Sequence, residues 1–176
     1  KIRSTVILSA GKIFNLNQKK LINICAAVEC IHSYSLIHDD LPCMDDDSIR
    51  RGKPSTHIKY GEASAVLAGN SLLTLAFEII ADKNYLINSN SKNEIIKSLA
   101  FCSGHTGIAG GQELDLKFEN KKKSFKQIIE MQKKKTGKLF SFCLYAVGVV
   151  AKRNHKEKIL LSKLGEEIGL LFQLTD

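Results

Sequence analysis

The chain of 176 residues contains no tryptophan, only two prolines and only two methionines. Proline interrupts helices because it lacks a backbone N–H, so its scarcity permits long, unbroken helices. No segment shows the alternation of apolar and polar residues that marks a half-buried strand. We therefore expect an all-α fold and no β-sheet.

Long hydrophobic runs are also missing. No apolar run reaches the roughly 20 residues that a membrane span needs, and the longest, residues 139–151, fits a buried helix. The five cysteines are scattered without a Cys-x-x-Cys pair, which favours a reducing cytoplasm. The net charge of +8 comes largely from lysines on solvated helix faces. Aromatic residues are not interleaved with the basic clusters, which argues against a nucleic-acid partner.

Acidic residues are concentrated in one stretch, residues 37–57, which reads IHDDLPCMDDDSIRRGKPSTH and holds five aspartates within nine positions. The apolar spacing before it is helical, so Asp39 and Asp40 fall at a helix C-terminus, where the helix dipole disfavours anions. Pro42 forces a turn, after which Asp45 can return toward them. A protein that accepts this electrostatic cost usually has cations to bind there.

Magnesium fits this pattern, because it is held through one or two carboxylates and leaves other positions to water and phosphate. Arg50 and Arg51 follow the aspartates, and guanidinium groups bind phosphate oxygens bidentately. The pattern therefore favours Mg²⁺ and a diphosphate ligand. The alternative is a solvated acidic loop neutralised by its own arginines. A calcium EF-hand is disfavoured, because no register supplies both the glycine and the glutamate that its loop requires.

The stretch resembles the first aspartate-rich motif of the trans-isoprenyl diphosphate synthases (polyprenyl synthetases), DDxxxxD followed by RRGxPxxH. Later residues are similar to the family's GQxxDL motif, its KTG motif and the opening of its second aspartate-rich motif, in that order. They are Gly111, Gln112, Leu114, Asp115 and Leu116; Lys135, Thr136 and Gly137; and Phe172, Gln173 and Asp176. The resemblance covers essentially the whole chain and implies an isoprenoid-synthase-type bundle of long helices around a central cavity.

The domain organisation follows from the same resemblance. The sequence begins without methionine and stops inside the last motif. We therefore expect residues 1–176 to form a single polyprenyl-synthetase domain that is truncated at both ends.

The activity that the resemblance implies is prenyl transfer. Isopentenyl diphosphate would condense with dimethylallyl or geranyl diphosphate, with Mg²⁺ as cofactor, and the product would be farnesyl diphosphate. The resemblance assigns metal binding to Asp39, Asp40, Asp45 and Asp176. It assigns substrate binding to Arg3, His32, Arg50, Arg51, Lys135, Thr136 and Gln173, of which the last three are also catalytic.

The spacing of His32 from Asp39 also bears on its role, independently of the resemblance. A lone histidine in a helix is more often structural than functional. His32 lies seven residues before Asp39, about two helical turns, so both side chains project from the same face. Gln112 and Asp115, three residues apart, also share a face. We expect these two to line the pocket behind the metal site, although a polar pair in a helix interface is an equal alternative.

Product length depends on the positions before the first aspartate. In the family, the positions of Tyr34 and Ser35 lie along the floor of the cavity in which the product grows. The ring of Tyr34 would block that cavity and favour a product of fifteen carbons over twenty. The alternative is a tyrosine that packs in a helix interface.

Other functions remain open. A geranylgeranyl diphosphate synthase would use the same chemistry, and a terpene cyclase would ionise a similar diphosphate. A cyclase has no use for a second cationic pocket, so Arg3, His32 and Arg51 together favour the transferase. A catalytically silent subunit of a heterodimeric synthase and a helical scaffold are the non-enzymatic alternatives. By resemblance, the helix at residues 60–82 would support a homodimer.

The remaining apolar spacings predict helices in several places. The expected ranges are residues 1–14, 19–40, 60–82, 93–118, 125–152 and 157–176, with polar loops at 84–92 and 121–124. Glycine destabilises helices, so the glycine-rich segment within residues 93–118 indicates close packing or a kink. Ser124 and Gln127 match a capping box at the start of the next helix.

Overall fold

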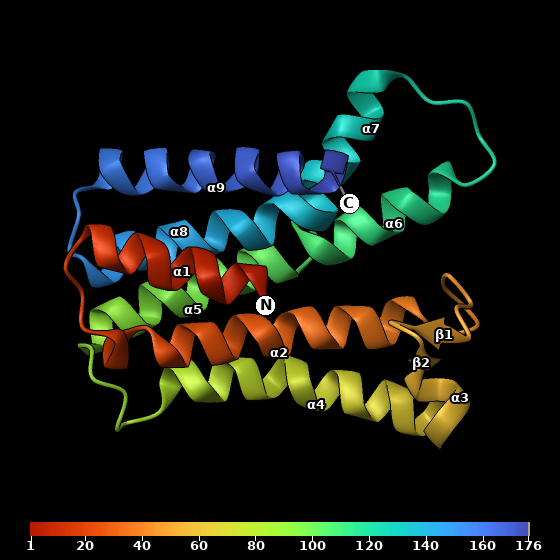
Figure 1. Ribbon diagram of the computed structural model, residues 1–176, viewed down its shortest axis with the longest axis horizontal. Helices are drawn as coiled ribbons and strands as arrows, with labels where there is room; N and C mark the ends of the chain where they lie inside the picture. The colour runs from red at the N-terminus through yellow and green to blue at the C-terminus, as the bar shows by residue number, and fades with distance from the viewer. Residues whose placement is uncertain (176) are drawn as a thin grey trace.

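The computed structural model describes residues 1–175 and is almost entirely helical (Figure 1). The helices are α1 (Ile2–Ile13), α2 (Ile22–Asp39), α3 (Thr56–Tyr60), α4 (Glu62–Ala81), α5 (Ser89–Ser103), α6 (Ile108–Phe118), α7 (Phe125–Gln132), α8 (Lys138–Val150) and α9 (His155–Thr175). Two short turns join them, the 3₁₀ turn η1 (Gln18–Lys20) and the π-helical turn η2 (Lys133–Gly137). The expected all-α bundle is confirmed.

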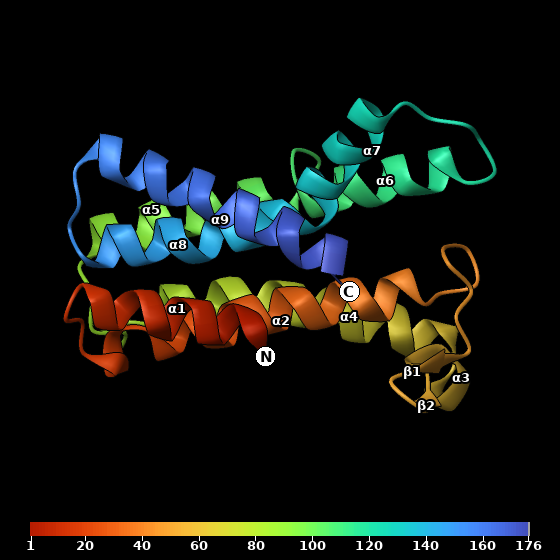
Figure 2. The same cartoon turned by 45° about the horizontal axis from the view of Figure 1, so that its top comes forward.

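The bundle has two layers (Figure 2). One contains α1, α2 and α4, and the other contains α5, α8 and α9, with α6 and α7 extending from it at one end. Helix α8 lies at the centre, where it packs against α1, α2, α5 and α9. It is apolar on every face, and its Phe140, Phe142 and Val147 are fully buried. Such a helix is stable only inside a core.

Helices α2 and α4 pack closely along their length. Ile24, Val28 and Ile31 of α2 are fully buried in the core. Near the carboxyl end of α2, a methyl group on Gly69 of α4 would overlap the ring of His38. A glycine at this position therefore lets the two helices approach each other.

Helix boundaries differ from the sequence prediction in three places. The expected helix 93–118 is two helices, because the chain breaks at residues 104–107 between α5 and α6. There the backbone of Gly107 comes so close to that of Cys102 that a side chain would overlap it. The expected helix 125–152 is interrupted by η2, and α5 begins at Ser89, inside the expected loop. The Ser124–Gln127 capping box is confirmed.

The expectation of no β-sheet is wrong in one small respect. Strands β1 (Ile49–Arg50) and β2 (Lys53–Pro54) pair antiparallel in a minimal hairpin. Arg51 and Gly52 form its turn, both with positive φ (53° and 74°). Two residues per strand are too few to show an alternating pattern, so periodicity could not reveal this hairpin.

One described helix bears on the expected absence of a membrane span. Helix α4 is long and apolar enough, by length and composition alone, to cross a bilayer. A single helix of this kind is weak evidence, because helices of soluble proteins pass the same test. The helix lies against α2 in the bundle, and several of its apolar side chains, including Leu67 and Leu75, are exposed.

Candidate active site

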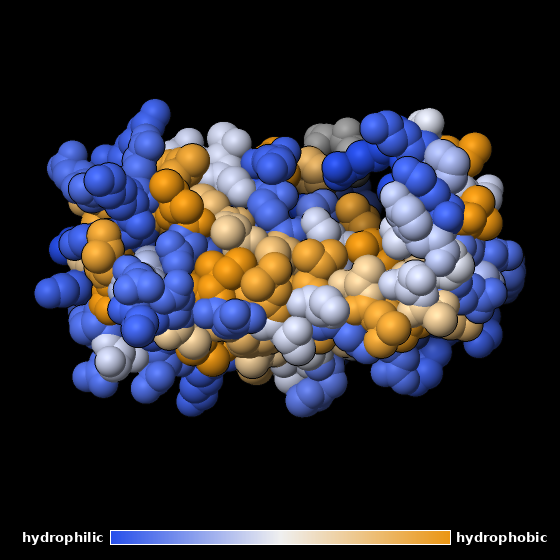
Figure 3. Space-filling model, turned by 90° about the horizontal axis from the view of Figure 1, so that it is seen from below, coloured by the Kyte–Doolittle hydropathy of each residue, from blue (hydrophilic) through white to orange (hydrophobic). Residues whose placement is uncertain are grey.

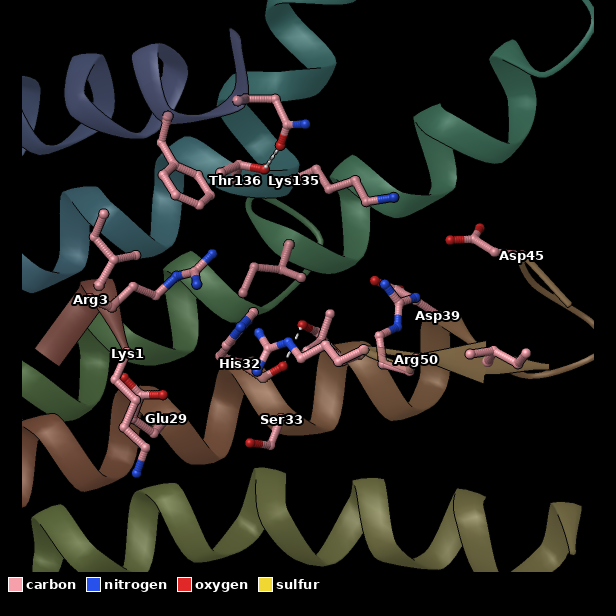
Figure 4. Close-up of a pocket in the computed structure, with 18 residues that line it drawn as sticks. Lys1, Arg3, Glu29, His32, Ser33, Asp39, Asp45, Arg50, Lys135 and Thr136 are labelled. Carbon is pink, nitrogen blue, oxygen red and sulfur yellow. Dashed lines mark hydrogen bonds between the residues drawn. The ribbon is translucent and has the colours of Figure 1, made fainter. Parts of the chain in front are cut away.

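A cavity of about 720 Å³ opens between the two layers of the bundle (Figure 4). Residues of α1, α2 and the β1 hairpin form one side of it, and η2 with the end of α9 forms the other. Of the residues singled out in the sequence, those that line it are Arg3, His32, Ser35, Asp39, Asp45, Arg50, Arg51, Lys135, Thr136 and Gln173. Side chains far apart in the sequence therefore meet in one cavity.

The aspartates lie where α2 ends. Helix α2 ends at Asp39, and the loop then turns back, so that the N–H of Asp45 donates to the carbonyl oxygen of Asp39 at 2.9 Å. This confirms the predicted return of Asp45. Burial raises the pKa of Asp39 from 3.8 to about 6, an effect that the nearby Lys135 opposes and Asp45 reinforces. Part of the Asp39 population is therefore protonated near neutral pH when no cation is bound.

Asp40 is not among the residues that line the cavity. Its side chain is buried and accepts hydrogen bonds from Arg50, including one from Nε at 2.9 Å. Arg50 also donates to Asp47 at 3.2 Å. The hairpin therefore brings Arg50 to the aspartates and places Arg51, the next residue, on the cavity wall. The predicted closeness of Arg50 to the acidic cluster is confirmed, and Arg51 lines the same cavity as Asp39 and Asp45.

A second group of basic residues in the cavity comprises Arg3 of α1, His32 of α2 and Arg51 of the hairpin. Arg3 is buried beneath the ring of Phe140, with 4.9 Å between its Cζ and the ring centroid. Its Nε has no hydrogen-bond partner among the described residues. Burial, together with the charge of Arg3, lowers the pKa of His32 to about 4, so His32 is neutral at pH 7. Within the described part of the chain, no ion pair involves Arg3 or Arg51. At this end of the cavity the two arginines face a single carboxylate, that of Glu29.

The opposite wall carries the remaining predicted catalytic residues. Lys135 and Thr136 belong to the π-helical turn η2. Such turns are rare in proteins, and many of those known lie at functional sites. The Thr136 hydroxyl donates to Oε1 of Gln173 at 2.9 Å, which joins η2 to α9. In Figure 4 the side chain of Lys135 extends across the cavity toward the side that carries Asp39 and Asp45.

Gln112 and Asp115 lie behind this wall. Neither lines the cavity, but each contacts a residue that does. Gln112 Nε2 donates to Oδ1 of Asp45 at 3.0 Å, and Lys135 Nζ donates to Oδ2 of Asp115 at 2.5 Å. The two residues therefore support the lining of the pocket from behind instead of forming its surface.

The two residues expected to set product length, Tyr34 and Ser35, lie in different surroundings. Ser35 lines the cavity, whereas Tyr34 is packed in the core, where its ring meets that of His38 edge to face at 5.6 Å. Asp176, the predicted metal ligand of the second cluster, lies outside the described residues.

Some cavity residues were missed in the sequence. Glu29 and Ser33 of α2 line the cavity, and Glu29 accepts a hydrogen bond from Ser4 at 2.6 Å. Glu29 lies three residues before His32, so the helical spacing that linked His32 to Asp39 could have found it. Ile108, at the start of α6, was signalled by nothing in the sequence, because only the break before α6 brings it to the cavity.

The donor atoms at the carboxyl end of α2 suit a hard divalent cation. Asp39 and Asp45 present carboxylates to the cavity, with Asp40 beside them. Among the described residues, no three His, Cys, Asp or Glu side chains form a group that could enclose a metal. Mg²⁺ needs only one or two carboxylates when water and phosphate complete its octahedron. The residues present therefore fit Mg²⁺ bound together with a phosphate-containing ligand.

The sequence profile of polyprenyl synthetases matches residues 1–176. The chain belongs to the polyprenyl synthetase family. It is 37% identical over 177 residues to a farnesyl diphosphate synthase of Bacillus subtilis and 41% identical over 179 residues to one of Escherichia coli. Each alignment covers 100% of this chain and 60% of the relative. The chain thus spans about 60% of the length of these polyprenyl synthetases.

Solved structures of the family show the same fold. An FPP/GFPP synthase from Zymomonas mobilis superposes with a TM-score of 0.94 at 40% identity, covering 99% of this chain and 63% of that one. A geranyltransferase from Helicobacter pylori, solved with magnesium and isoprenyl diphosphate, gives 0.90 at 37% identity, covering 99% and 59%. The isoprenoid-synthase-type bundle inferred from the motifs is confirmed.

Proposed function

We propose that the complete protein is a prenyltransferase that condenses isopentenyl diphosphate with dimethylallyl or geranyl diphosphate to give farnesyl diphosphate. One observation carries the proposal: a single cavity has two ends of different charge. Asp39 and Asp45 face Lys135 at one end, and Arg3, His32 and Arg51 meet at the other. A carboxylate end suits a metal-bound diphosphate, and an end where two arginines outnumber the one carboxylate of Glu29 suits a second anion. The names of the relatives support this assignment.

The carboxylate end would ionise the allylic diphosphate. Mg²⁺ bound at Asp39, Asp40 and Asp45 would supply neutralisation of the charge on the leaving diphosphate. Lys135 and Arg50 would donate hydrogen bonds to phosphate oxygens on which charge develops as the C–O bond breaks. The backbone carbonyl oxygens of Lys135 and Thr136 would face the allylic cation, and the Thr136–Gln173 hydrogen bond would hold that part of the turn in place.

The cationic end would hold isopentenyl diphosphate. Arg3 and Arg51 would bind its phosphates ionically, and neutral His32 would donate one hydrogen bond. The double bond of this substrate attacks the allylic cation and forms the new C–C bond. The carbocation formed by this attack loses a proton from the adjacent carbon to the released diphosphate. This step restores an alkene and removes the positive charge.

We also propose that the protein forms a homodimer through α4. The apolar side chains Val66, Leu67 and Leu75 are 40%, 65% and 40% exposed on this helix. Hydrophobic residues form a band on the face of the molecule to which α4 belongs (Figure 3). Exposed apolar patches of this kind are typical of interfaces, and a second copy presents the same patch. A cytoplasmic location is a further proposal, supported by the five free thiols.

Product analysis of the complete protein tests the proposed function. The protein is incubated with Mg²⁺, isopentenyl diphosphate and geranyl diphosphate, and the prenyl alcohols are separated after phosphatase treatment. A fifteen-carbon product is expected, and a twenty-carbon product would indicate a geranylgeranyl diphosphate synthase. Absence of elongation in a folded protein would refute the transferase, in favour of a cyclase if geranyl diphosphate is consumed alone, or of a silent subunit if it is not.

A further inference from the structure

Helix α6 contacts both the backbone and the ammonium group of Lys135. Its backbone lies in the π-helical turn η2, against α6. A methyl group added to Gly111 of α6 would overlap the backbone nitrogen and Cα of Lys135. The backbone of the lysine therefore rests directly on α6, and only glycine at position 111 allows this approach.

The ammonium group is held one turn further along α6. Nζ of Lys135 donates to Oδ2 of Asp115 at 2.5 Å. Gly111 and Asp115 are four residues apart, so they lie on the same face of the helix. Contact at Gly111 fixes where the lysine side chain begins, and the carboxylate of Asp115 fixes where it ends.

Asp115 does not compete for the place that a ligand would occupy. Lys135 lines the cavity and Asp115 does not. An ammonium group has three N–H donors, so one donor can stay with Asp115 while two face the cavity. The lysine and aspartate side chains are 23% and 37% exposed, so the pair lies at the cavity wall and is partly shielded from solvent.

We propose that Asp115 is a positioning residue that acts through Lys135, holding its ammonium group in place for the diphosphate of the allylic substrate. The inference rests on the proposed function, because it concerns the same site. Lysine has one of the most flexible side chains, and ordering it on binding lowers affinity. With Asp115 in place, the Lys135 side chain is already ordered before the ligand binds.

A double-mutant cycle tests the proposal, with the complete protein and inorganic diphosphate plus Mg²⁺ as the probe. Calorimetry gives the dissociation constant of the wild type, Asp115→Ala, Lys135→Ala and the double variant. Asp115→Ala is expected to weaken binding about tenfold, in the range for hydrogen bonds to charged groups. In the Lys135→Ala background the same substitution is expected to change nothing, because Asp115 then has no lysine to position.

Two variants separate positioning from a general structural effect. Glu113→Ala removes a neighbouring carboxylate of α6 that pairs with Lys117 at 2.6 Å on the exposed face, and it should leave binding unchanged. Asp115→Asn keeps a hydrogen-bond acceptor and should retain part of the affinity; it replaces Asp115→Ala in the cycle if the latter fails to fold. In steady-state kinetics, Asp115→Ala should raise the KM for the allylic substrate and leave that for isopentenyl diphosphate unchanged.

Equal losses in both backgrounds of the cycle would overturn the proposal, since they would show that Asp115 acts without Lys135. Tighter diphosphate binding by Asp115→Ala would also overturn it, because the carboxylate would then be a competitor. These results differ from failure of the proposed function, in which the wild type itself would not bind diphosphate with Mg²⁺.

Discussion

Arg50 donates two hydrogen bonds, from Nε and Nη2, to the same oxygen of Asp40. The aspartate side chain is 4% exposed and the arginine side chain 35%. Hydrogen bonding to Asp40 raises the pKa of Arg50 above its ordinary value. The guanidinium therefore binds a carboxylate that the proposed function assigns to Mg²⁺, and a cation at Asp40 has to share it or displace it.

Arg50→Ala should destabilise the metal-free protein by about 1 to 3 kcal/mol, because it leaves a buried carboxylate without its partner. Arg51→Ala is the matched control and should change stability by less than about 0.5 kcal/mol, since its side chain is exposed and has no ion pair among the described residues. Urea unfolding measures both. Mg²⁺ should restore more stability to Arg50→Ala than to wild type; equal effects of Mg²⁺ would contradict the competition at Asp40.

Asp39 should impose a stability cost that its function requires. A pKa raised from 3.8 to about 6 means that the folded protein is penalised for the charged form above pH 6. Asp39→Asn should therefore raise the stability of the metal-free protein at pH 7.5 by roughly 1 to 3 kcal/mol. This gain should shrink as the pH falls through about 6 toward 3.8, where wild-type Asp39 becomes neutral.

Substitution of Asp39 should lower turnover, although it should raise stability. In the complete protein, Asp39→Asn and Asp39→Ala should each lower turnover by orders of magnitude with folding intact, because a proposed metal ligand is lost. Thermal unfolding at several pH values and steady-state rates measure the two effects on the same samples. Near-normal turnover by either variant would disprove the metal assignment.

His32 should titrate far below an ordinary histidine. Its pKa is about 4 because it is buried beside Arg3, so the ring is neutral in the ligand-free protein at pH 7. Binding of an anion next to the ring favours its protonated form, so the pKa should rise when isopentenyl diphosphate binds. NMR titration of the ring, with exposed His155 as an internal reference, measures the shift. An unchanged pKa on binding would remove His32 from the diphosphate site.

Tyr34→Ala should lengthen the product if the ring limits the cavity. Removal of the ring would leave a void beside His38 that the growing chain could fill. Chromatography of the products should show twenty carbons or more, at a cost of about 3 to 5 kcal/mol in stability. Tyr60→Ala, which truncates an exposed tyrosine, is the control. A product of unchanged length would show that Tyr34 is only a packing residue of the core.

Leu67→Glu should convert a dimer into a monomer, because it places a charge in the proposed apolar interface on α4. Analytical ultracentrifugation of the complete protein measures the mass. Phe125→Glu, at a residue of α7 that is 77% exposed, should leave the mass unchanged. A wild-type protein that sediments as a monomer would refute the dimer.

The sequence by itself determined the helical class, the concentration of carboxylates and arginines in residues 37–57 and the family. These features are local, since helical spacing, a turn at Pro42 and a density of carboxylates depend on neighbouring residues. The return of Asp45 to Asp39 was predictable for the same reason, because a short loop joins them.

Only the tertiary structure decided which polar side chains pair with each other. The pairing of Arg50 with Asp40, of Lys135 with Asp115 and of Gln112 with Asp45 joins side chains 10, 20 and 67 residues apart. Such contacts depend on how whole helices pack, and no periodic pattern encodes them. The break before α6 and the π-turn in the middle of an expected helix set that packing, and backbone contact between Gly111 and Lys135 brings the two together.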